Sequence, residues 1–260
     1  MSNRLPGSLY DYPAYYDLVF GSDWKAEFAF LEKCFAKFAV GKVRRVFEPA
    51  CGTGRLLIRL AQAGYQISGL DLNSHAVAYC NERLKRHGFR YRVTVGDMTD
   101  FTLPRPVDAA FNMINSFRHL PTEEAAQAHL RCMAAALRPG GLYMLGLHLT
   151  PTRGTAMDEE AWSARRGHLQ VNTRLKTVRR RPSKREEWFT MTCEIYTPSS
   201  YKQLSEEIMF RSYTARQFDD LLASVGGFSV VETFDFHYRI DHPIVITPQT
   251  EDVVYVLRRE

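Results

Sequence analysis

Short apolar runs alternate with stretches of helical periodicity in the first 150 residues, a pattern typical of α/β proteins. The apolar runs predict a strand that begins at Val46, followed by strands at residues 65–72, 91–98, 107–114 and 142–148. The periodic stretches predict helices at residues 25–38, 74–86 and 123–137. Asn73 and Thr122 are the expected N-caps of the second and third helices, and Pro139-Gly140-Gly141 is expected to end the third. The first helix is expected to present one face made of Ala26, Ala29, Phe30, Lys33 and Cys34.

Between residues 150 and 214 the apolar positions recur with period two instead, which predicts antiparallel strands. These strands are expected in residues 169–175, 187–196 and 204–213. The basic run Arg179–Arg185 contains Pro182 and Ser183, which favour a turn, so we expect a solvent-exposed hairpin tip. A contact with nucleic acid is the alternative interpretation of this run. The α/β pattern then resumes, with a helix at 214–224 and strands at 228–236 and 253–257.

A glycine-rich turn follows the first strand, in the segment Val46–Arg55, and a helix is expected directly after it. Gly52 and Gly54 can adopt positive φ and let the backbone approach a ligand, and the free N–H groups of a helix start favour polar or anionic atoms. A turn of this kind also occurs in α/β proteins for structural reasons alone. The turn by itself therefore leaves nucleotide-like ligands and a purely structural role equally open.

The second strand ends in an acid, Asp71, which lies 71 − 54 = 17 residues after Gly54. Dinucleotide-binding folds place a ribose-binding acid about 20 residues after the turn, so Asp71 is expected to hold a ribose. The turn is not GxGxxG, because Ala50 and Leu57 occupy its first and third glycine positions, and Glu48 precedes it. This combination fits NAD poorly and fits S-adenosyl-L-methionine (SAM) well, since SAM carries cationic groups and no pyrophosphate.

Four successive segments together resemble the motifs of class I SAM-dependent methyltransferases, in family order over roughly residues 10–150. They are Glu48–Gly54, Gly69–Asp71, Gly96–Met98 and Leu137–Gly141. The resemblance is nearest to the glycine N-methyltransferase and sugar N-methyltransferase group. It implies an α/β Rossmann-like seven-stranded sheet of order 3-2-1-4-5-7-6, with the last strand antiparallel and a small antiparallel β insertion after strand five. The expected units are an N-terminal aromatic lid and helix (1–40), a SAM-binding core (41–150), the insertion on the substrate side (151–213) and the completion of the core (214–260).

The composition is that of an ordinary globular protein, with 45% hydrophobic and 24% charged residues, and no apolar run approaches 18 residues. Residues Met1–Gly7 lack the apolar core of a signal peptide, so a cytoplasmic location is expected. The five cysteines are odd in number and lie 17 or more residues apart, which excludes CxxC metal or redox motifs. A net charge of +5 is too small to indicate nucleic acid by itself.

The resemblance also assigns cofactor contacts. Aromatic residues concentrate in residues 8–24, and in related enzymes such a segment covers the cofactor; Tyr16 is the first choice for this contact and Tyr10 the second. Met113 is expected at the methionine end of SAM, and Asp97 and Met98 are expected at its adenine. His119 is expected to lie against the cofactor. Asp97 is alternatively a turn former. The complete expected cofactor set is Tyr16, Glu48, Ala50, Cys51, Gly52, Gly54, Asp71, Leu72, Asp97, Met98, Met113 and His119.

The expected catalytic residues are His148 and Asn115. The segment Asn115–Pro121 is similar to one in glycine N-methyltransferase, in which the Asn115 position binds substrate. His148 is expected at the carboxyl end of strand five, where that enzyme carries a carboxylate-binding arginine, so a free amino acid is disfavoured as substrate. His148 is preferred to His119 as a proton acceptor.

Three classes of function remain open. The first is a small-molecule N- or O-methyltransferase, because the aromatic lid and the insertion would enclose a compact acceptor. The second is an RNA or DNA methyltransferase, although Asn112-Met113-Ile114-Asn115 differs from the motifs that grip a flipped base and no Pro-Cys nucleophile occurs. The third is a SAM-binding protein without turnover. The expected partner is a small molecule in preference to nucleic acid, and no membrane partner is expected.

Overall fold

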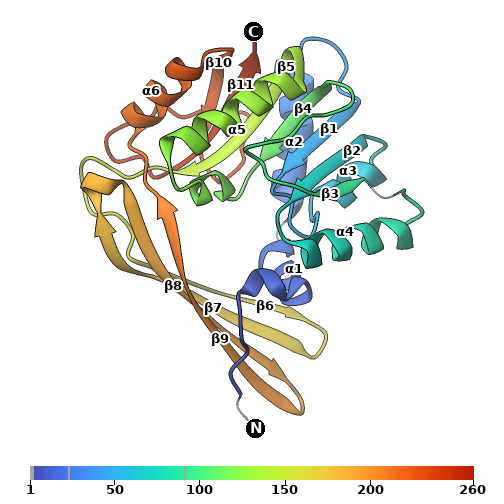
Figure 1. Ribbon diagram of the computed structural model, residues 1–260, viewed down its shortest axis with the longest axis vertical. Coiled ribbons are helices and arrows are strands. Elements are labelled where there is room, and N and C mark those ends of the chain that lie inside the picture. The colour runs from blue at the N-terminus through green and yellow to red at the C-terminus, as the bar shows by residue number, and fades with distance from the viewer. Residues whose placement is uncertain (1–2, 23, 91) are drawn as a thin grey trace.

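The computed structural model describes residues 3–22, 24–90 and 92–260 and contains two β-sheets. A seven-stranded sheet has the order β10-β11-β5-β4-β1-β2-β3, and a separate four-stranded sheet has the order β6-β7-β8-β9 (Figure 1). β11 is antiparallel to both of its neighbours, whereas β3, β2, β1, β4 and β5 are mutually parallel. The fold class expected from the sequence is thereby confirmed.

The strands of the large sheet match the apolar runs closely. They are β1 (Arg45–Pro49), β2 (Gln66–Asp71), β3 (Val93–Val95), β4 (Val107–Asn112), β5 (Leu137–His148), β10 (Phe228–Phe234) and β11 (Asp252–Arg259). β3 is shorter than the expected 91–98, and Tyr91 lies outside the described residues. All six residues of β4 are buried, as expected for a central strand covered on both faces.

Helices cover both faces of this sheet and give a three-layer arrangement. One face packs against α2 (Trp24–Phe38), α3 (Leu57–Gln62) and α4 (Ser74–Arg86), and the other against α5 (Glu123–Ala136) and α6 (Ala215–Val225). Alternate strand residues point to opposite faces, so Met144 joins the first core and Tyr143 the second. Asn73, Thr122 and Thr214 cap the starts of α4, α5 and α6 with side-chain hydrogen bonds.

Two expectations about element faces and boundaries were wrong. The buried face of α2 carries Glu27, Phe30, Leu31, Cys34 and Phe35. Ala26, Ala29 and Lys33 are exposed, because the large side chains at the neighbouring positions bury more apolar surface and set the rotation of the helix.

Pro139-Gly140-Gly141 does not separate α5 from the following strand, because β5 begins at Leu137. Leu137 pairs with Val107, and pairing resumes between Leu142 and Ala109, so the intervening residues form an irregularity inside the strand. Gly140, with φ 74°, allows the backbone to bend there.

The insertion is a twisted antiparallel sheet that projects from one end of the core (Figure 1). Its strands are β6 (Glu159–Arg166), β7 (Leu169–Arg181), β8 (Glu186–Thr197) and β9 (Ser200–Arg211). The pattern had indicated β7, β8 and β9, whereas β6 was missed. β6 is an edge strand in which Ala164 alone is buried, so its apolar alternation is weak.

The N-terminal segment packs on this insertion. A 3₁₀ turn, Leu9–Asp11, and the helix α1 (Pro13–Gly21) share an apolar cluster with the inner face of the four-stranded sheet. Asp17 of α1 is buried and ties the three parts together, because its carboxylate accepts hydrogen bonds from Arg83 of α4 at 2.6 Å and from Arg166 of β6 at 3.1 Å. Among the described residues, no helix has the length and apolarity needed to cross a membrane.

The basic run Arg179–Arg185 is only partly a solvent-exposed tip. Pro182–Lys184 form the expected turn, but two arginines point back into the molecule. Arg180 pairs with Asp158 and Glu187, and Arg185 donates to Glu123 at 2.7 Å. Arg185 also lies 4.5 Å over the ring of Tyr213. The local pattern predicted that these arginines would be exposed to solvent. The tertiary fold instead brings carboxylates close enough to form ion pairs with them.

Candidate active site

The loop that follows β1 forms the floor of a cleft at the carboxyl ends of the parallel strands, where open α/β sheets bind ligands. Ala50 and Gly52, with φ 51° and 52°, curve the chain so that the Gly52 N–H points toward β2. A Cβ on Gly52 would lie 3.2 Å from the ring of Tyr16, so the glycine allows the aromatic lid to approach. Gly54 has another role, since a Cβ there would lie 2.3 Å from Cys80 Sγ in α4.

Asp71 lies at the end of β2 and lines the same cleft. One carboxylate oxygen accepts the N–H of Gly52 at 2.7 Å, and the other accepts the N–H of Asn73 at 2.8 Å. Burial raises the pKa of Asp71, and the two N–H donors oppose that rise. The two N–H groups hold the carboxylate in place. Each oxygen can still accept a further hydrogen bond from a hydroxyl group.

The N-terminal segment forms one wall of the cleft. Tyr10 and Tyr16 form a ring pair with centroids 5.5 Å apart, and the Tyr10 hydroxyl lies 3.0 Å from His119 Nε2. Apolar walls suited to an adenine-sized ring come from Leu70, Leu72 and Met98.

A small buried recess continues from the floor of the cleft and carries polar groups without partners. It is lined by Tyr16, Glu48, Ala50, Cys51, Thr53, Arg55, Asn112, Met113, Ile114 and Ser116. Within the described part of the chain, Glu48 Oε2 and Asn112 Oδ1 are buried and accept no hydrogen bond. Burial raises the pKa of Glu48 well above its ordinary value, although Arg55 opposes this. Two buried acceptors without partners match the ammonium of an amino acid moiety. Arg55, which pairs with Glu27 through Nη1, has further N–H donors that match the carboxylate, so the recess fits the methionine end of SAM.

A second cavity opens beyond Tyr10, Tyr16, Ser116 and His119, the residues that line both spaces. It lies between the core and the inner face of the four-stranded sheet, which contributes Trp162, Leu175, Phe189, Met191 and Phe210. His119 stands at the junction, and its pKa is lowered to about 4 by burial and by the neighbouring Arg118. Its imidazole is therefore neutral at pH 7 and can accept a hydrogen bond from the Tyr10 hydroxyl.

Asn115 and His148 lie together on the wall of this second cavity. Asn115 has φ 54° and its side-chain oxygen accepts the backbone N–H of His148 at 3.1 Å, so it fixes the end of β5. His148 Nδ1 is 2.5 Å from Asp252 Oδ1, which is its partner across the β5–β11 pair. Asp252 contacts Nδ1, and among the described residues Nε2 of this ring has no hydrogen-bond partner.

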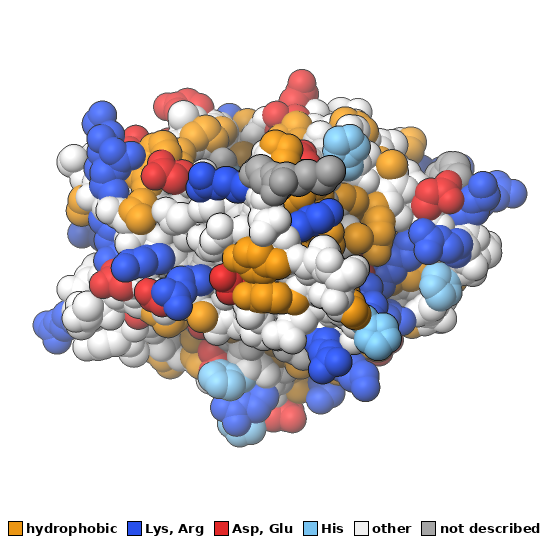
Figure 2. Space-filling model, turned by 90° about the horizontal axis from the view of Figure 1, so that it is seen from below, with side chains coloured by type: hydrophobic (Ala, Val, Ile, Leu, Met, Phe, Trp, Pro, Cys, Tyr) orange, Lys and Arg blue, Asp and Glu red, His pale blue; other side chains and the backbone are white. Residues whose placement is uncertain are grey.

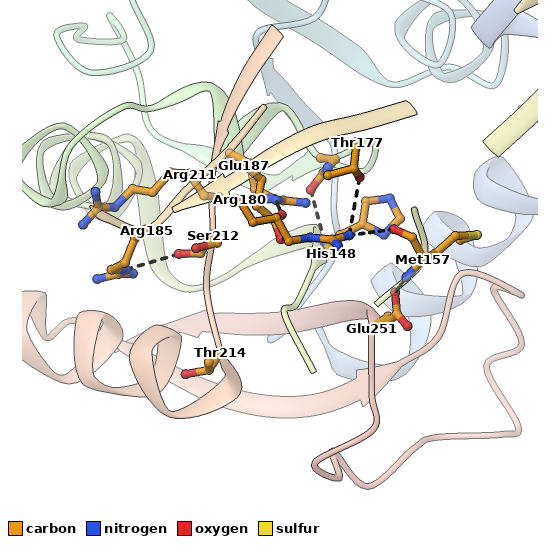
Figure 3. Close-up of polar contacts among 12 residues, drawn as sticks. His148, Met157, Thr177, Arg180, Arg185, Glu187, Arg211, Ser212, Thr214 and Glu251 are labelled. Atoms are coloured by element: carbon orange, nitrogen blue, oxygen red, sulfur yellow. Dashed lines mark hydrogen bonds and ion pairs between the residues drawn. The ribbon is translucent and has the colours of Figure 1, made fainter. Parts of the chain in front are cut away.

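An ion-pair network, which the sequence did not reveal, forms another part of the wall (Figure 3). Glu187 is buried and pairs with both Arg118 and Arg180. Arg180 further donates to Asp158 at 2.5 Å and to the Met157 carbonyl at 3.0 Å. Arg118 is adjacent to His119 in the sequence, so it could have been predicted as a site residue. Glu187 lies in a strand that contains no recognisable motif, so nothing in the sequence pointed to it.

The expected cofactor residues fall into three groups. Tyr16, Ala50, Gly52, Asp71, Leu72, Met98 and His119 line the cleft. Glu48, Cys51 and Met113 line the recess. Gly54 and Asp97 line neither, since Gly54 packs on α4 and Asp97 accepts hydrogen bonds from the N–H and hydroxyl of Thr99 within its own turn. Arg55 and Asn112 are additions that the structure makes to the set.

The segment that builds this cleft matches a known family. Residues 46–141 match the family of methyltransferase domains. The chain carries a methyltransferase domain. This domain begins in β1 and ends in β5, so the insertion and the last two strands lie outside the matched residues.

Relatives of the methyltransferase domain act on different molecules. The ribosomal RNA small subunit methyltransferase C of Alcanivorax borkumensis is 30% identical over 111 residues, covering 41% of this chain and 33% of that protein. The dTDP-3-amino-3,6-dideoxy-alpha-D-glucopyranose N,N-dimethyltransferase of Streptomyces fradiae is 31% identical over 133 residues, covering 50% of each. The chain thus spans a third to a half of the length of these curated relatives.

Agreement in fold extends beyond the methyltransferase domain. The SAM-bound structure of CalS10, an amino pentose methyltransferase from Micromonospora echinaspora, has a TM-score of 0.74 at 22% identity and covers 98% of both chains. The resemblance to class I SAM-dependent methyltransferases is therefore confirmed, and SAM is the cofactor of that family.

Proposed function

We propose that this protein is a SAM-dependent methyltransferase that transfers a methyl group to a nitrogen or oxygen of a small molecule. The observation that carries the proposal is the connection between the two spaces: the cleft below the lid meets the second cavity at Tyr10, Tyr16, Ser116 and His119. A cofactor and an acceptor bound in these spaces would face each other across those four side chains.

The cleft and its recess supply the groups that SAM requires. Asp71 would hold the ribose hydroxyls, Glu48 and Asn112 the ammonium, and Arg55 the carboxylate. When bound there, SAM supplies an electrophilic methyl group on a positively charged sulfur. Tyr16 and Tyr10 line the cleft, and aromatic rings can stabilise such a cation.

The protein's own residues then have three tasks. Tyr10, Tyr16 and α1 exclude water from the junction, because the segment is held to the insertion by buried apolar contacts and by Asp17. Asn115 fixes the position of His148. His148 Nε2, or the neutral His119, would accept the proton that a nitrogen or oxygen acceptor loses.

Calorimetric titration of the purified protein with SAM, S-adenosylhomocysteine and NAD tests the first half of the proposal. Binding of the two adenosyl compounds and not of NAD is expected. Transfer of a labelled methyl group from SAM to a panel of amines, phenols and alcohols tests the second half. Binding of NAD alone would overturn the proposal, and SAM binding without transfer to any acceptor would leave a SAM-binding protein without turnover.

A ribosomal RNA methyltransferase among the relatives keeps RNA as a second candidate acceptor. The second cavity, called the acceptor cavity from here on, favours a compact molecule as acceptor, because the four-stranded sheet and the N-terminal segment enclose it. On the face shown in Figure 2, Lys and Arg side chains occur on both sides of the view, with Asp and Glu among those on the left and hydrophobic side chains near the centre. Methylation of ribosomal RNA that weakens steeply with added salt would favour the second candidate.

A further inference from the structure

Aromatic rings line the acceptor cavity from its junction with the cofactor cleft to the edge of the four-stranded sheet. The ring centroids of Tyr16 and Phe20 are 4.8 Å apart, and those of Phe20 and Trp162 are 5.9 Å apart. Phe189 and Phe210 form another ring pair on the wall, at 5.4 Å. Such surfaces bind apolar groups and also cations, which are attracted to the faces of the rings.

A carboxylate lies beside the outer end of this row. Glu160 and Trp162 are two residues apart in β6, so their side chains share one face of the strand, and both line the cavity. Glu160 is half-buried, and among the residues that the structure describes its carboxylate has no hydrogen-bond or ion-pair partner. An acid next to an indole ring is a combination suited to an ammonium group.

The positively charged side chains of the cavity wall are already engaged in ion pairs. Arg118 pairs with Glu187 and donates to the Arg211 carbonyl at 2.9 Å, and Arg180 is held by Asp158 and Glu187. The wall as a whole carries five carboxylates against these two guanidinium groups, on Asp158, Glu159, Glu160, Glu187 and Glu251. A phosphate or carboxylate in the cavity would face an excess of negative charge, and it could recruit an arginine only by breaking a buried ion pair.

We propose that the acceptor is a cationic amine with at least two amino groups and without phosphate or carboxylate groups. One amino group would lie at the junction near His119, and a second, protonated one would be anchored between Glu160 and Trp162. This inference rests on the proposed methyltransferase function and narrows it to a class of acceptor. It separates this protein from enzymes whose acceptor is linked to a nucleotide diphosphate.

The test uses linear α,ω-diamines of three to eight carbons, each compared with the monoamine of the same length. Their affinities for the complex of the protein with S-adenosylhomocysteine are measured by calorimetry. The best diamine is expected to bind about tenfold more tightly than its monoamine, because only the diamine engages the anchor. Glu160→Gln and Trp162→Leu should each remove most of that difference. Glu207→Gln, which removes an equal charge from an exposed position of β9, is the matched control and should leave it intact.

A second arm measures transfer of labelled methyl groups from SAM to the same diamines and to a dTDP-linked 3-amino sugar. Transfer to the diamine and not to the nucleotide-linked sugar is expected. The inference is overturned if the sugar nucleotide is the better acceptor, if no diamine binds, or if Glu160→Gln changes diamine affinity less than twofold. None of these results contradicts the proposed function. A failure to bind S-adenosylhomocysteine would contradict both the proposed function and the inference about the acceptor.

Discussion

The cofactor cleft and the acceptor cavity are adjacent, yet the chain builds them in different ways. Apart from the lid, Ser116 and His119, the cleft comes from three short segments at or directly after the carboxyl ends of β1, β2 and β3. The acceptor cavity collects side chains from Tyr10 to Glu251, across both sheets. The first site thus follows from local backbone geometry, and the second from packing between distant parts of the chain.

Their polar groups are also held differently. In the cleft, backbone N–H groups of Gly52 and Asn73 fix Asp71, so a few residues of a loop suffice. In the cavity, side chains far apart in the sequence fix each other, as Arg118 and Glu187 do. Under the proposed function, substitutions in the cavity would change the acceptor while the cleft and the sheet stay the same, which agrees with the different molecules named for the relatives.

The largest effect is expected from breaking the network in the cavity wall. Glu187→Gln leaves the buried Arg118 without its anion, and removing one partner of a buried pair costs about 3–5 kcal/mol of unfolding free energy. Urea denaturation measures this loss. Glu159→Gln is the control, because its pair with Arg174 is exposed and should contribute less than about 0.5 kcal/mol.

A double variant sharpens the same comparison. Replacing Arg118 and Glu187 together by Met removes both charges and should restore most of the lost stability, since a buried pair contributes little beyond an apolar pair of similar size. Equal stability of wild type and Glu187→Gln would contradict the claim that the wall depends on this network.

In the cleft, the expected effect is on binding. Among the described residues that line the cleft, the carboxylates are Asp71 and the exposed Asp11, so Asp71→Ala removes the carboxylate placed to accept ribose hydroxyls. Affinity for S-adenosylhomocysteine should fall by about 2–3 kcal/mol, or roughly 30- to 150-fold. Asp97→Ala should change affinity less than about threefold, because that side chain bonds to Thr99 in its own turn. Calorimetry of both variants decides between the two acids, and a larger loss for Asp97→Ala would reverse the assignment.

These two acids illustrate how far the sequence could lead. Both end a predicted strand, but only the structure distinguishes the acid that lines the cleft from the one that closes a turn. The strands of the large sheet and the glycine loop were predictable, because period and spacing are local properties, whereas the order of the sheet was implied by the resemblance to class I methyltransferases. β6 and the inward turn of Arg180 were not, since an edge strand has weak alternation and the partners of an arginine depend on tertiary contacts.

At the junction of the two sites, burial gives stability a pH dependence. The pKa of His119 falls from an ordinary 6.5 to about 4 in the folded protein, so between these values the unfolded chain binds more protons. Stability should therefore fall as the pH drops from about 6.5 to 4, and His119 should account for about 2 kcal/mol of the loss. Urea titrations at pH 7 and 4.5 measure it.

His129 serves as an internal comparison, because burial lowers its pKa to about 4 as well and it does not line the cleft. It lies between the Met98 carbonyl and the Tyr143 hydroxyl. His119→Gln should remove one part of the acid sensitivity and leave the part due to His129. Addition of S-adenosylhomocysteine should protect wild type by binding the folded state alone. An unchanged pH profile in His119→Gln would show that its imidazole is not buried as described.

The smallest effect concerns the backbone of the glycine-rich loop, where Ala50 occupies a left-handed conformation that glycine adopts more easily. Ala50→Gly relieves about 1 kcal/mol of strain but makes the unfolded chain more flexible, so a net stabilisation of about 0.5 kcal/mol is expected in thermal denaturation. Gly52→Ala should have the opposite sign, since φ is also positive there and the new Cβ would lie 3.2 Å from the Tyr16 ring. Because Ala50 contributes shape and no charge, its replacement should leave cofactor affinity within about twofold. A large loss of affinity in Ala50→Gly would mean that the side-chain methyl group of Ala50 contacts the cofactor. The loop would then bind its ligand through side chains, as the acceptor cavity is proposed to do.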